Sequence, residues 1–182
     1  MIISITGTPG TGKTSISKLL KDKGFEVVNF NKVAIENNFL IGKDKKRDSF
    51  IVDIKKFNKY AKENYNQKKF IFIEGHLSHL LKSVNKVIVI RCHPDELRKN
   101  LSNRDWNKQK IKENIESEIL DVILCEALDL HKPEDIFEID TTGKSIEDVF
   151  SSVMEIIENK FSNMKKYNIG MIDWSEEILK DF

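Results

Sequence analysis

The stretch Gly7-Thr8-Pro9-Gly10-Thr11-Gly12-Lys13-Thr14 decides the fold of this chain. It matches in full the pattern G-x-x-x-x-G-K-[ST] of the phosphate-binding P-loop. The apolar run at 2–6 comes directly before it, and an amphipathic pattern at 12–23, closed by Gly24, comes directly after it. These patterns predict strand, loop and helix in the order that the motif requires, and therefore a nucleoside triphosphate site at this point of the fold.

Each residue type in the loop suits phosphate binding. Glycines such as Gly10 and Gly12 let the backbone turn tightly and point N–H groups inward, and the first turn of the next helix adds its own unpaired N–H groups. We expect Lys13 to reach the β- and γ-phosphates and the Thr14 hydroxyl to ligate Mg²⁺. We expect Ser15 to meet the α-phosphate. The loop specifies ATP or GTP with Mg²⁺ and says nothing of the acceptor.

Short β-rich runs alternate with helical patterns along the rest of the chain. Several runs are almost continuously apolar, as strands are when both faces of a parallel sheet are covered. The expected strands are 2–6, 26–30, 70–74, 86–91 and 136–140, and the expected helices are 12–23, 53–65, 94–101, 108–130 and 145–162. This order predicts one α/β domain of the P-loop NTPase class, with a five-stranded parallel sheet and helices on both faces.

Two segments are longer than such a sheet needs. Residues 31–69 separate the second strand from the third, and residues 102–130 begin with a polar, charged stretch. Both are expected at the C-terminal edge of the sheet, where open α/β folds bind ligands, so we interpret them as lobes over the site. The tail at 163–182 is amphipathic and is expected to pack back on the core, with the docking of a partner as the alternative.

The composition fits a cytoplasmic protein of one domain. The 182 residues include 30 lysines and arginines against 29 aspartates and glutamates, a balance that excludes a chain built to coat a polyanion. No apolar stretch of about 18 residues is present, and the chain starts directly with a strand-like run, so we expect neither a membrane span nor a secretory signal. Cys92 and Cys125 lack a CxxC spacing and are interpreted as reduced core thiols.

The third expected strand ends in two polar residues, Glu74 and His76. In P-loop folds the strand beside the loop commonly offers a carboxylate to Mg²⁺, so Glu74 is a candidate metal ligand together with Thr14. The imidazole of His76 suits proton transfer near neutrality and is a candidate for orienting the attacking group, with an ordinary capping role as the alternative. His79 follows, but two histidines without a third ligand do not favour zinc, so His79 is expected on a helix surface or in packing.

Arginine is scarce in this chain, which uses lysine as its default cation. The four arginines are Arg47, Arg91, Arg98 and Arg104, and the last three fall within fourteen residues. Phosphoryl transfer builds charge on phosphate oxygens, and arginines on a closing lid would stabilise that charge and exclude water. Arg104 lies in the polar stretch 103–107 and is the leading candidate for contact with ATP. A surface salt bridge is the alternative, above all for Arg98.

The chain resembles the small adenylate kinase-like proteins of archaea and eukaryotes, of the adenylate kinase isoenzyme six type. The stretches that carry the resemblance are 5–14, 74–76, 89–92, 104–106, 112–116, 118–123 and 140–143, and they keep the order of the family. The resemblance implies a nucleoside monophosphate kinase-like fold with an acceptor lobe at about 30–53 and a short lid at about 103–113. Candidate acceptor contacts are Arg47, Asp53 and Arg91. Asn100 stands where we expect a basic residue.

The same resemblance implies an activity and a partner. The activity is phosphoryl transfer from ATP to AMP or another nucleoside monophosphate, together with ATP hydrolysis. The implied partner is a small-subunit ribosomal protein within a pre-ribosomal particle, in late maturation of the small subunit and rRNA processing, without direct sequence-specific binding of nucleic acid. Two alternatives remain at this point: an ATP-driven assembly factor whose kinase activity is incidental, and a P-loop kinase of a non-nucleotide metabolite.

Overall fold

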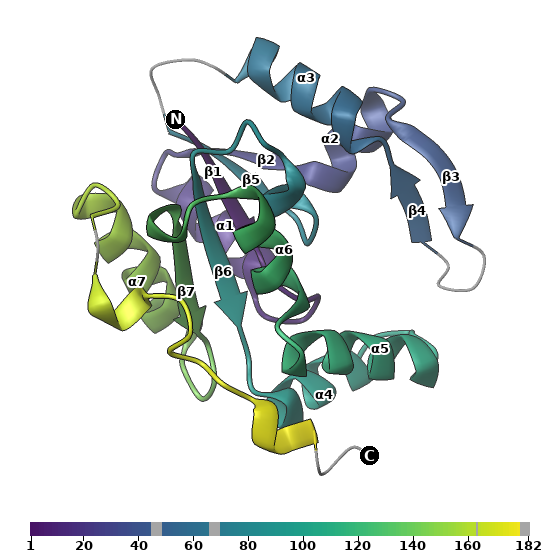
Figure 1. The fold of residues 1–182 in the computed structure, drawn as a ribbon, viewed down its shortest axis with the longest axis vertical. Helices are drawn as coiled ribbons and strands as arrows, with labels where there is room; N and C mark the ends of the chain where they lie inside the picture. Colours follow the sequence, from purple (N-terminus) through teal and green to yellow (C-terminus); the bar gives the residue numbers. More distant parts are fainter. Residues whose placement is uncertain (45–48, 66–69, 163, 179–182) are drawn as a thin grey trace.

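Five parallel strands form the centre of the computed structural model, which describes residues 1–44, 49–65, 70–162 and 164–178 (Figure 1). The strands are β1 (Ile2–Thr6), β2 (Glu26–Asn29), β5 (Ile71–Glu74), β6 (Lys86–Arg91) and β7 (Ile136–Asp140), in the spatial order β2-β5-β1-β6-β7. The strand that leads into the phosphate loop is therefore central. The expected five-stranded parallel sheet is confirmed.

Helices pack on both faces of this sheet, as expected. They are α1 (Lys13–Asp22), α2 (Phe30–Glu36), α3 (Ile54–Asn64), α4 (Pro94–Ser102), α5 (Lys108–Ile119), α6 (Val122–Leu130) and α7 (Ile146–Glu158), with short 3₁₀ helices at Ser78–Leu80, Pro133–Asp135, Lys165–Tyr167 and Ser175–Glu177. Ile3 and Ile5 of β1 point to the face covered by α1 and α7. Ile2 points to the opposite face, where α2, α3 and α6 pack. Because successive side chains of a strand point to opposite faces of the sheet, β1 contributes residues to two separate apolar cores.

The long helix expected at 108–130 is in fact two helices. α5 ends at Ile119 and α6 begins at Val122, because Asp121 between them adopts the left-handed conformation with φ 53°. The guanidinium of Arg91 donates to the Glu118 carbonyl oxygen at 3.1 Å and also contacts the Asp121 carboxylate. These bonds from Arg91 of β6 stabilise the break between the two helices. No Gly or Pro in this part of the sequence predicts the break.

A small antiparallel hairpin stands beside α2 and α3 (Figure 1). It consists of β3 (Leu40–Asp44) and β4 (Ser49–Val52), and it occupies the segment expected as the acceptor lobe. Phe50 and Ile51 of the hairpin are more than two-fifths exposed. Arg47, one of the expected acceptor contacts, lies outside the described residues.

A third apolar cluster joins α4 and α5 beside the phosphate loop. Its buried members are Cys92, Leu97, Leu101, Ile115 and Ile119. α4 packs so closely on the loop that a Cβ at Gly10 would lie 2.9 Å from Cδ1 of Leu97. Cys92 is buried as expected, whereas Cys125 on α6 is exposed, so the interpretation of both cysteines as core thiols is wrong for Cys125. None of the helices in the described ranges is long and apolar enough to cross a membrane.

The tail crosses the sheet edge after α7. Tyr167 is buried in the core under α7, and the Gly170 N–H donates to Glu138 of β7 at 2.6 Å. Further along, Ile178 packs against the α4–α5 cluster. Figure 1 shows this yellow segment passing β7 and ending beside α4. Within its described residues, 164–178, the tail therefore packs on the core through Tyr167 and Ile178.

Candidate functional site

A cavity of about 620 Å³ lies beside the phosphate loop, at the C-terminal edge of the sheet. Its lining includes eight residues singled out from the sequence: Gly10, Gly12, Lys13, Thr14, Ser15, Glu74, His76 and Arg104. They come from the loop and α1, from the end of β5 and from the connection between α4 and α5. The parallel sheet brings these three regions together because β5 and β6, the strand before α4, are the direct neighbours of β1.

The backbone of the loop is shaped by glycine. Gly7 has φ 136°, and a Cβ there would lie 2.2 Å from the Ile90 carbonyl oxygen, so the strand can enter the loop only with glycine at this position. α1 begins at Lys13, and its first carbonyl acceptor, that of Gly12, is bonded to the Ser15 and Ile16 N–H groups, so the Lys13 and Thr14 N–H groups come before the first hydrogen bonds of the helix. These groups and the positive end of the helix dipole lie at the cavity, which suits them to an anion.

Lys13 is held inside the loop that carries it. Its Nζ donates to the Thr8 carbonyl oxygen at 2.9 Å, and only 7% of the residue is exposed. Burial lowers the pKa of Lys13 from 10.5 to about 8, while Glu74 and Glu118 oppose that shift by charge attraction. The ammonium group is thus partly desolvated and poised for a strong contact with a phosphate group.

Glu74 faces the first turn of α1 from the end of β5. Its Oε1 accepts a hydrogen bond from the Thr14 hydroxyl at 3.3 Å, and its Oε2 accepts one from Nδ2 of Asn29 at 2.7 Å. The pairing of β1 with β5 sets this arrangement, since Glu74 is in register with Ile5. A hydroxyl and a carboxylate side by side are the hard oxygen donors that Mg²⁺ accepts, so this pair fits a divalent cation.

His76 lines the same cavity in a neutral state. Burial, with the charges of Lys13 and Lys110 adding to it, lowers the pKa of His76 from 6.5 to about 4. At neutral pH the ring therefore offers an unprotonated nitrogen that can accept a proton or a hydrogen bond. His79 is fully buried instead, between the Thr6 hydroxyl at 2.9 Å and Glu126 at 3.0 Å. Of its two expected placements, the one in packing is correct.

Arg104 lies at the mouth of the cavity on the loop between α4 and α5. Its guanidinium carbon is 5.1 Å from the ring centroid of Trp106, and Lys110 Nζ is 4.6 Å from the same centroid. Trp106 itself packs against the α4–α5 cluster. The indole thus holds two cations beside the cavity and anchors them to the core below.

Two expected acceptor contacts have other roles in the structure. Arg91 is 2% exposed, and its guanidinium is bonded to Glu118 at 2.7 Å, to Glu138 at 2.7 Å and to Asp121. Asp53 caps α3, its carboxylate accepting from the Lys56 N–H at 3.0 Å. Neither residue is among those that line the cavity. We therefore assign Arg91 to the buried frame and Asp53 to helix capping.

Comparison with known proteins places this chain among nucleotide kinases. The family profile described as "AAA domain" matches residues 3–121. A Methanocaldococcus jannaschii protein named "Putative adenylate kinase" is 38% identical over 178 residues, which are 97% of this chain and 94% of the relative. A Thermococcus gammatolerans protein of the same name is 42% identical over 177 residues, again 97% and 94% of the two chains. The chain belongs to an adenylate kinase-like family.

Solved structures show how this adenylate kinase-like chain relates to other folds. The thymidylate kinase of Candida albicans has a TM-score of 0.54 at 16% identity, with 88% of this chain and 92% of that chain covered. A protein of Eubacterium ventriosum has a TM-score of 0.59 at 13% identity, with 87% and 98% covered. The chain therefore has the P-loop fold of nucleoside monophosphate kinases.

Some lining residues of the adenylate kinase-like site escaped sequence reasoning. They are Asn29, Asn31, Ser49, Lys110, Glu113 and Asn114. Asn29 ends β2 and also caps α2, accepting from the Lys32 N–H at 2.9 Å. A polar residue at the carboxyl end of β2, the strand next to β5, was the available signal for Asn29. For Ser49 there was no signal, since it depends on how the hairpin folds over the cavity.

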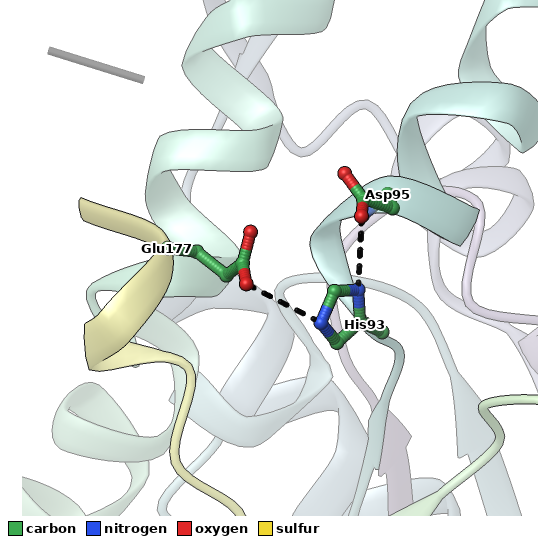
Figure 2. A group of neighbouring side chains, drawn as sticks. All are labelled: His93, Asp95 and Glu177. Carbon is green, nitrogen blue, oxygen red and sulfur yellow. Dashed lines mark hydrogen bonds and ion pairs between the residues drawn. The ribbon is translucent and has the colours of Figure 1, made fainter. Parts of the chain in front are cut away.

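A second group of polar side chains lies away from this cavity, where the tail meets α4 (Figure 2). His93 Nε2 is 3.6 Å from Glu177 Oε1, and His93 Nδ1 is 3.9 Å from Asp95 Oδ2. Nδ1 also accepts the Asp95 N–H at 3.2 Å, which caps α4. The two carboxylates face opposite nitrogens of one ring rather than one point, which does not favour a metal ion. We interpret the group as the anchor of the tail.

Proposed function

We propose that this chain is a nucleoside monophosphate kinase that transfers the γ-phosphoryl group of ATP to AMP, giving two ADP. One observation carries the proposal: a single cavity is lined by the loop lysine Lys13, the Glu74–Thr14 pair and the exposed Arg104. Such transfer depends mainly on positioning and on charge stabilisation, and these are the groups that supply both. The relatives named as adenylate kinases support AMP as the acceptor.

Mg²⁺ fits the proposal through the donor set of the site. Thr14 and Glu74 would hold the cation, which supplies charge neutralisation to the phosphate oxygens when bound. The remaining work falls to the chain itself. Lys13 keeps its hydrogen bond to the Thr8 carbonyl oxygen and binds the β- and γ-phosphates through its other N–H donors. The N–H groups of the loop and of α1 hold the phosphate chain, and Ser15 contacts the α-phosphate.

Arg104 and the segment at about 103–113 act as the lid in this proposal. The exposed guanidinium starts on the Trp106 ring and moves onto the phosphates as the segment closes, which excludes water from the transfer. The hairpin segment at about 30–53 holds the acceptor. Asn31 of α2 and Ser49 of β4 support this assignment because both reach the cavity from the lobe.

The experiment compares ADP formation by the purified protein from ATP with AMP and from ATP alone. AMP-dependent formation of two ADP for each ATP is the expected result, and a panel of other monophosphates ranks acceptor choice. Lys13→Ala, checked for folding by circular dichroism, should lack this activity, whereas Lys18→Ala on the exposed face of α1 should keep it. ADP formation that is indifferent to every monophosphate would reject the kinase assignment.

A second activity, ATP hydrolysis, is supported by His76. A neutral imidazole inside the ATP cavity is suited to accept a proton from an attacking water molecule. We propose that this cytoplasmic protein, as in the isoenzyme six type that it resembles, acts on a pre-ribosomal particle through a small-subunit ribosomal protein. We expect this chain to co-purify with a small-subunit ribosomal protein, and we expect the association to depend on ATP. Its absence, with kinase activity intact, would leave the kinase assignment alone.

A further inference from the structure

The side chain of Thr8 turns away from the ATP cavity and into the protein. Its hydroxyl donates a hydrogen bond of 2.5 Å to Oε2 of Glu118, which lies near the end of α5. Thr8 is 1% exposed and Glu118 is 2% exposed. The bond therefore joins the phosphate loop to the helix that begins just after Arg104 and Trp106, across 110 residues of chain.

The other oxygen of Glu118 is fixed as well. Oε1 accepts from Nε of Arg91 at 2.7 Å and from the Cys92 N–H at 3.2 Å. Burial of a carboxylate is costly unless donors surround it, and here three donors from β1–α1, from β6 and from the residue after β6 converge on one group. The donors at the end of β6 thus hold the Glu118 carboxylate in one position. Through its hydrogen bond to the Thr8 hydroxyl, the carboxylate in turn fixes the position of Thr8.

Thr8 in turn determines where Lys13 rests. The Thr8 carbonyl oxygen accepts from Lys13 Nζ at 2.9 Å, from the Thr11 hydroxyl at 3.0 Å and from the Thr11 N–H at 3.3 Å. One residue therefore receives the loop lysine on its main chain and the Glu118 carboxylate on its side chain. Displacement of Thr8 would move the acceptor of Lys13 and the turn of the loop together.

We propose that Glu118 is a positioning residue for the nucleotide site: through the Thr8 hydroxyl it holds the phosphate loop and Lys13 in the shape that binds ATP. Glu118 does not line the cavity, so it acts without touching the nucleotide. The inference rests on the ATP site of the proposed function. It also gives α5 a fixed end beside the loop, while the other end of the helix carries the lid.

The test measures ATP affinity with a fluorescent ATP analogue, and kcat and KM for ATP, in Glu118→Gln, Thr8→Val and the double variant. Thr8→Val leaves a buried Glu118 oxygen without its donor, and Glu118→Gln replaces the charged acceptor of the Thr8 hydroxyl with a neutral amide, so each should raise the Kd for ATP about tenfold. The double variant should be no worse than the poorer single variant, because the two residues act through one bond. Thr8→Ser, which restores the hydroxyl, should bind ATP far better than Thr8→Val.

Glu116→Gln is the matched control, since it removes the same charge from the same helix. Glu116 pairs with Lys112 at 3.5 Å on the partly exposed side of α5, and its replacement should leave ATP affinity within twofold. A folded Glu118→Gln protein with wild-type Kd and KM for ATP would overturn the proposal, as would strictly additive losses in the double variant. If Glu118→Gln does not fold, the Thr8→Val and Thr8→Ser pair decides, and equal affinities of these two overturn it. A wild-type protein that binds no ATP would instead reject the proposed function.

Discussion

The hydroxyl oxygen of Thr14 lies 3.3 Å from Oε1 of Glu74, although 60 positions separate the two residues in the chain. Thr14 comes from the first turn of α1 and Glu74 from the last residue of β5, and the parallel pairing of β1 with β5 brings the two together. Asn29 at the end of β2 then holds the far oxygen of Glu74 at 2.7 Å. Three neighbouring elements thus contribute one hydroxyl, one carboxylate and one amide to a site suited to a divalent cation.

Replacement of Glu74 should weaken the binding of Mg²⁺ and lower kcat. Glu74→Gln keeps the size of the side chain but removes the charge that a divalent cation needs, and its amide competes with the Asn29 donor. We expect kcat to fall about 10- to 100-fold and half-saturation to shift to higher Mg²⁺. The measurement is ADP formation against Mg²⁺ concentration. Equal Mg²⁺ curves for the two proteins would show that Glu74 does not serve the cation.

His76 should matter for hydrolysis more than for binding. In His76→Ala the cavity loses its neutral base, so we expect ATP hydrolysis to fall about 10²-fold or more while the Kd for ATP stays within a few fold. Both quantities are measured on the same preparation, by phosphate release and by nucleotide titration. Unchanged hydrolysis would favour the capping role for His76.

Acid should destabilise the folded protein through the same residue. The unfolded chain takes up a proton at the ordinary pKa of 6.5, whereas the folded state resists protonation until about pH 4. The free energy of unfolding should therefore fall as the pH drops from 6.5 towards 4, with a contribution of about 1–2 kcal/mol at pH 5. Urea denaturation at pH 7.5 and pH 5 measures it. His76→Asn should lose less stability between these pH values than the wild type, and an identical loss in both proteins contradicts the prediction.

Arg104 should contribute to turnover rather than to stability. A lid arginine interacts more strongly with the transition state than with bound ATP, so Arg104→Lys, which keeps the charge without the planar fork, should still lower kcat. Arg104→Ala should lower it about 10²- to 10³-fold. Arg98→Ala on the exposed face of α4 is the control and should turn over normally. Near-normal rates for both Arg104 variants would remove this residue from the lid.

The sheet and the loop were predictable because their signals are local. An apolar run buried on both faces identifies a parallel strand, and the P-loop pattern identifies the turn that follows β1. Glu74 could be found for the same reason, since the end of a strand beside the loop is a defined place. The helix break at Asp121 could not, because a left-handed aspartate in an amphipathic run is stabilised by Arg91 from another element.

Arg91 and Asp53, whose side chains have partners within the protein, show the same limit. Arg91 was grouped with Arg104 by its distance along the chain, yet strand β6 turns its side chain into the protein and onto Glu118 and Glu138. Asp53 was taken for an acceptor contact but precedes a helix and caps it. Residue type and spacing indicate which chemistry a side chain can perform. Which side of the sheet edge it faces depends on packing against segments far away in sequence.

The central position of β1 has a consequence for biosynthesis. During synthesis the N-terminal part of a chain emerges from the ribosome first, and the chain grows at about 5 to 20 residues per second. β1 emerges first, but the strands on its two sides span Ile71–Glu74 and Lys86–Arg91. This strand, which is fully buried in the folded protein, therefore waits for several seconds without neighbours, and Glu118, which bonds to Thr8 of its loop, arrives later still. We expect nascent chains shorter than about 90 residues to engage chaperones and to bind no nucleotide, because a non-local sheet cannot close early.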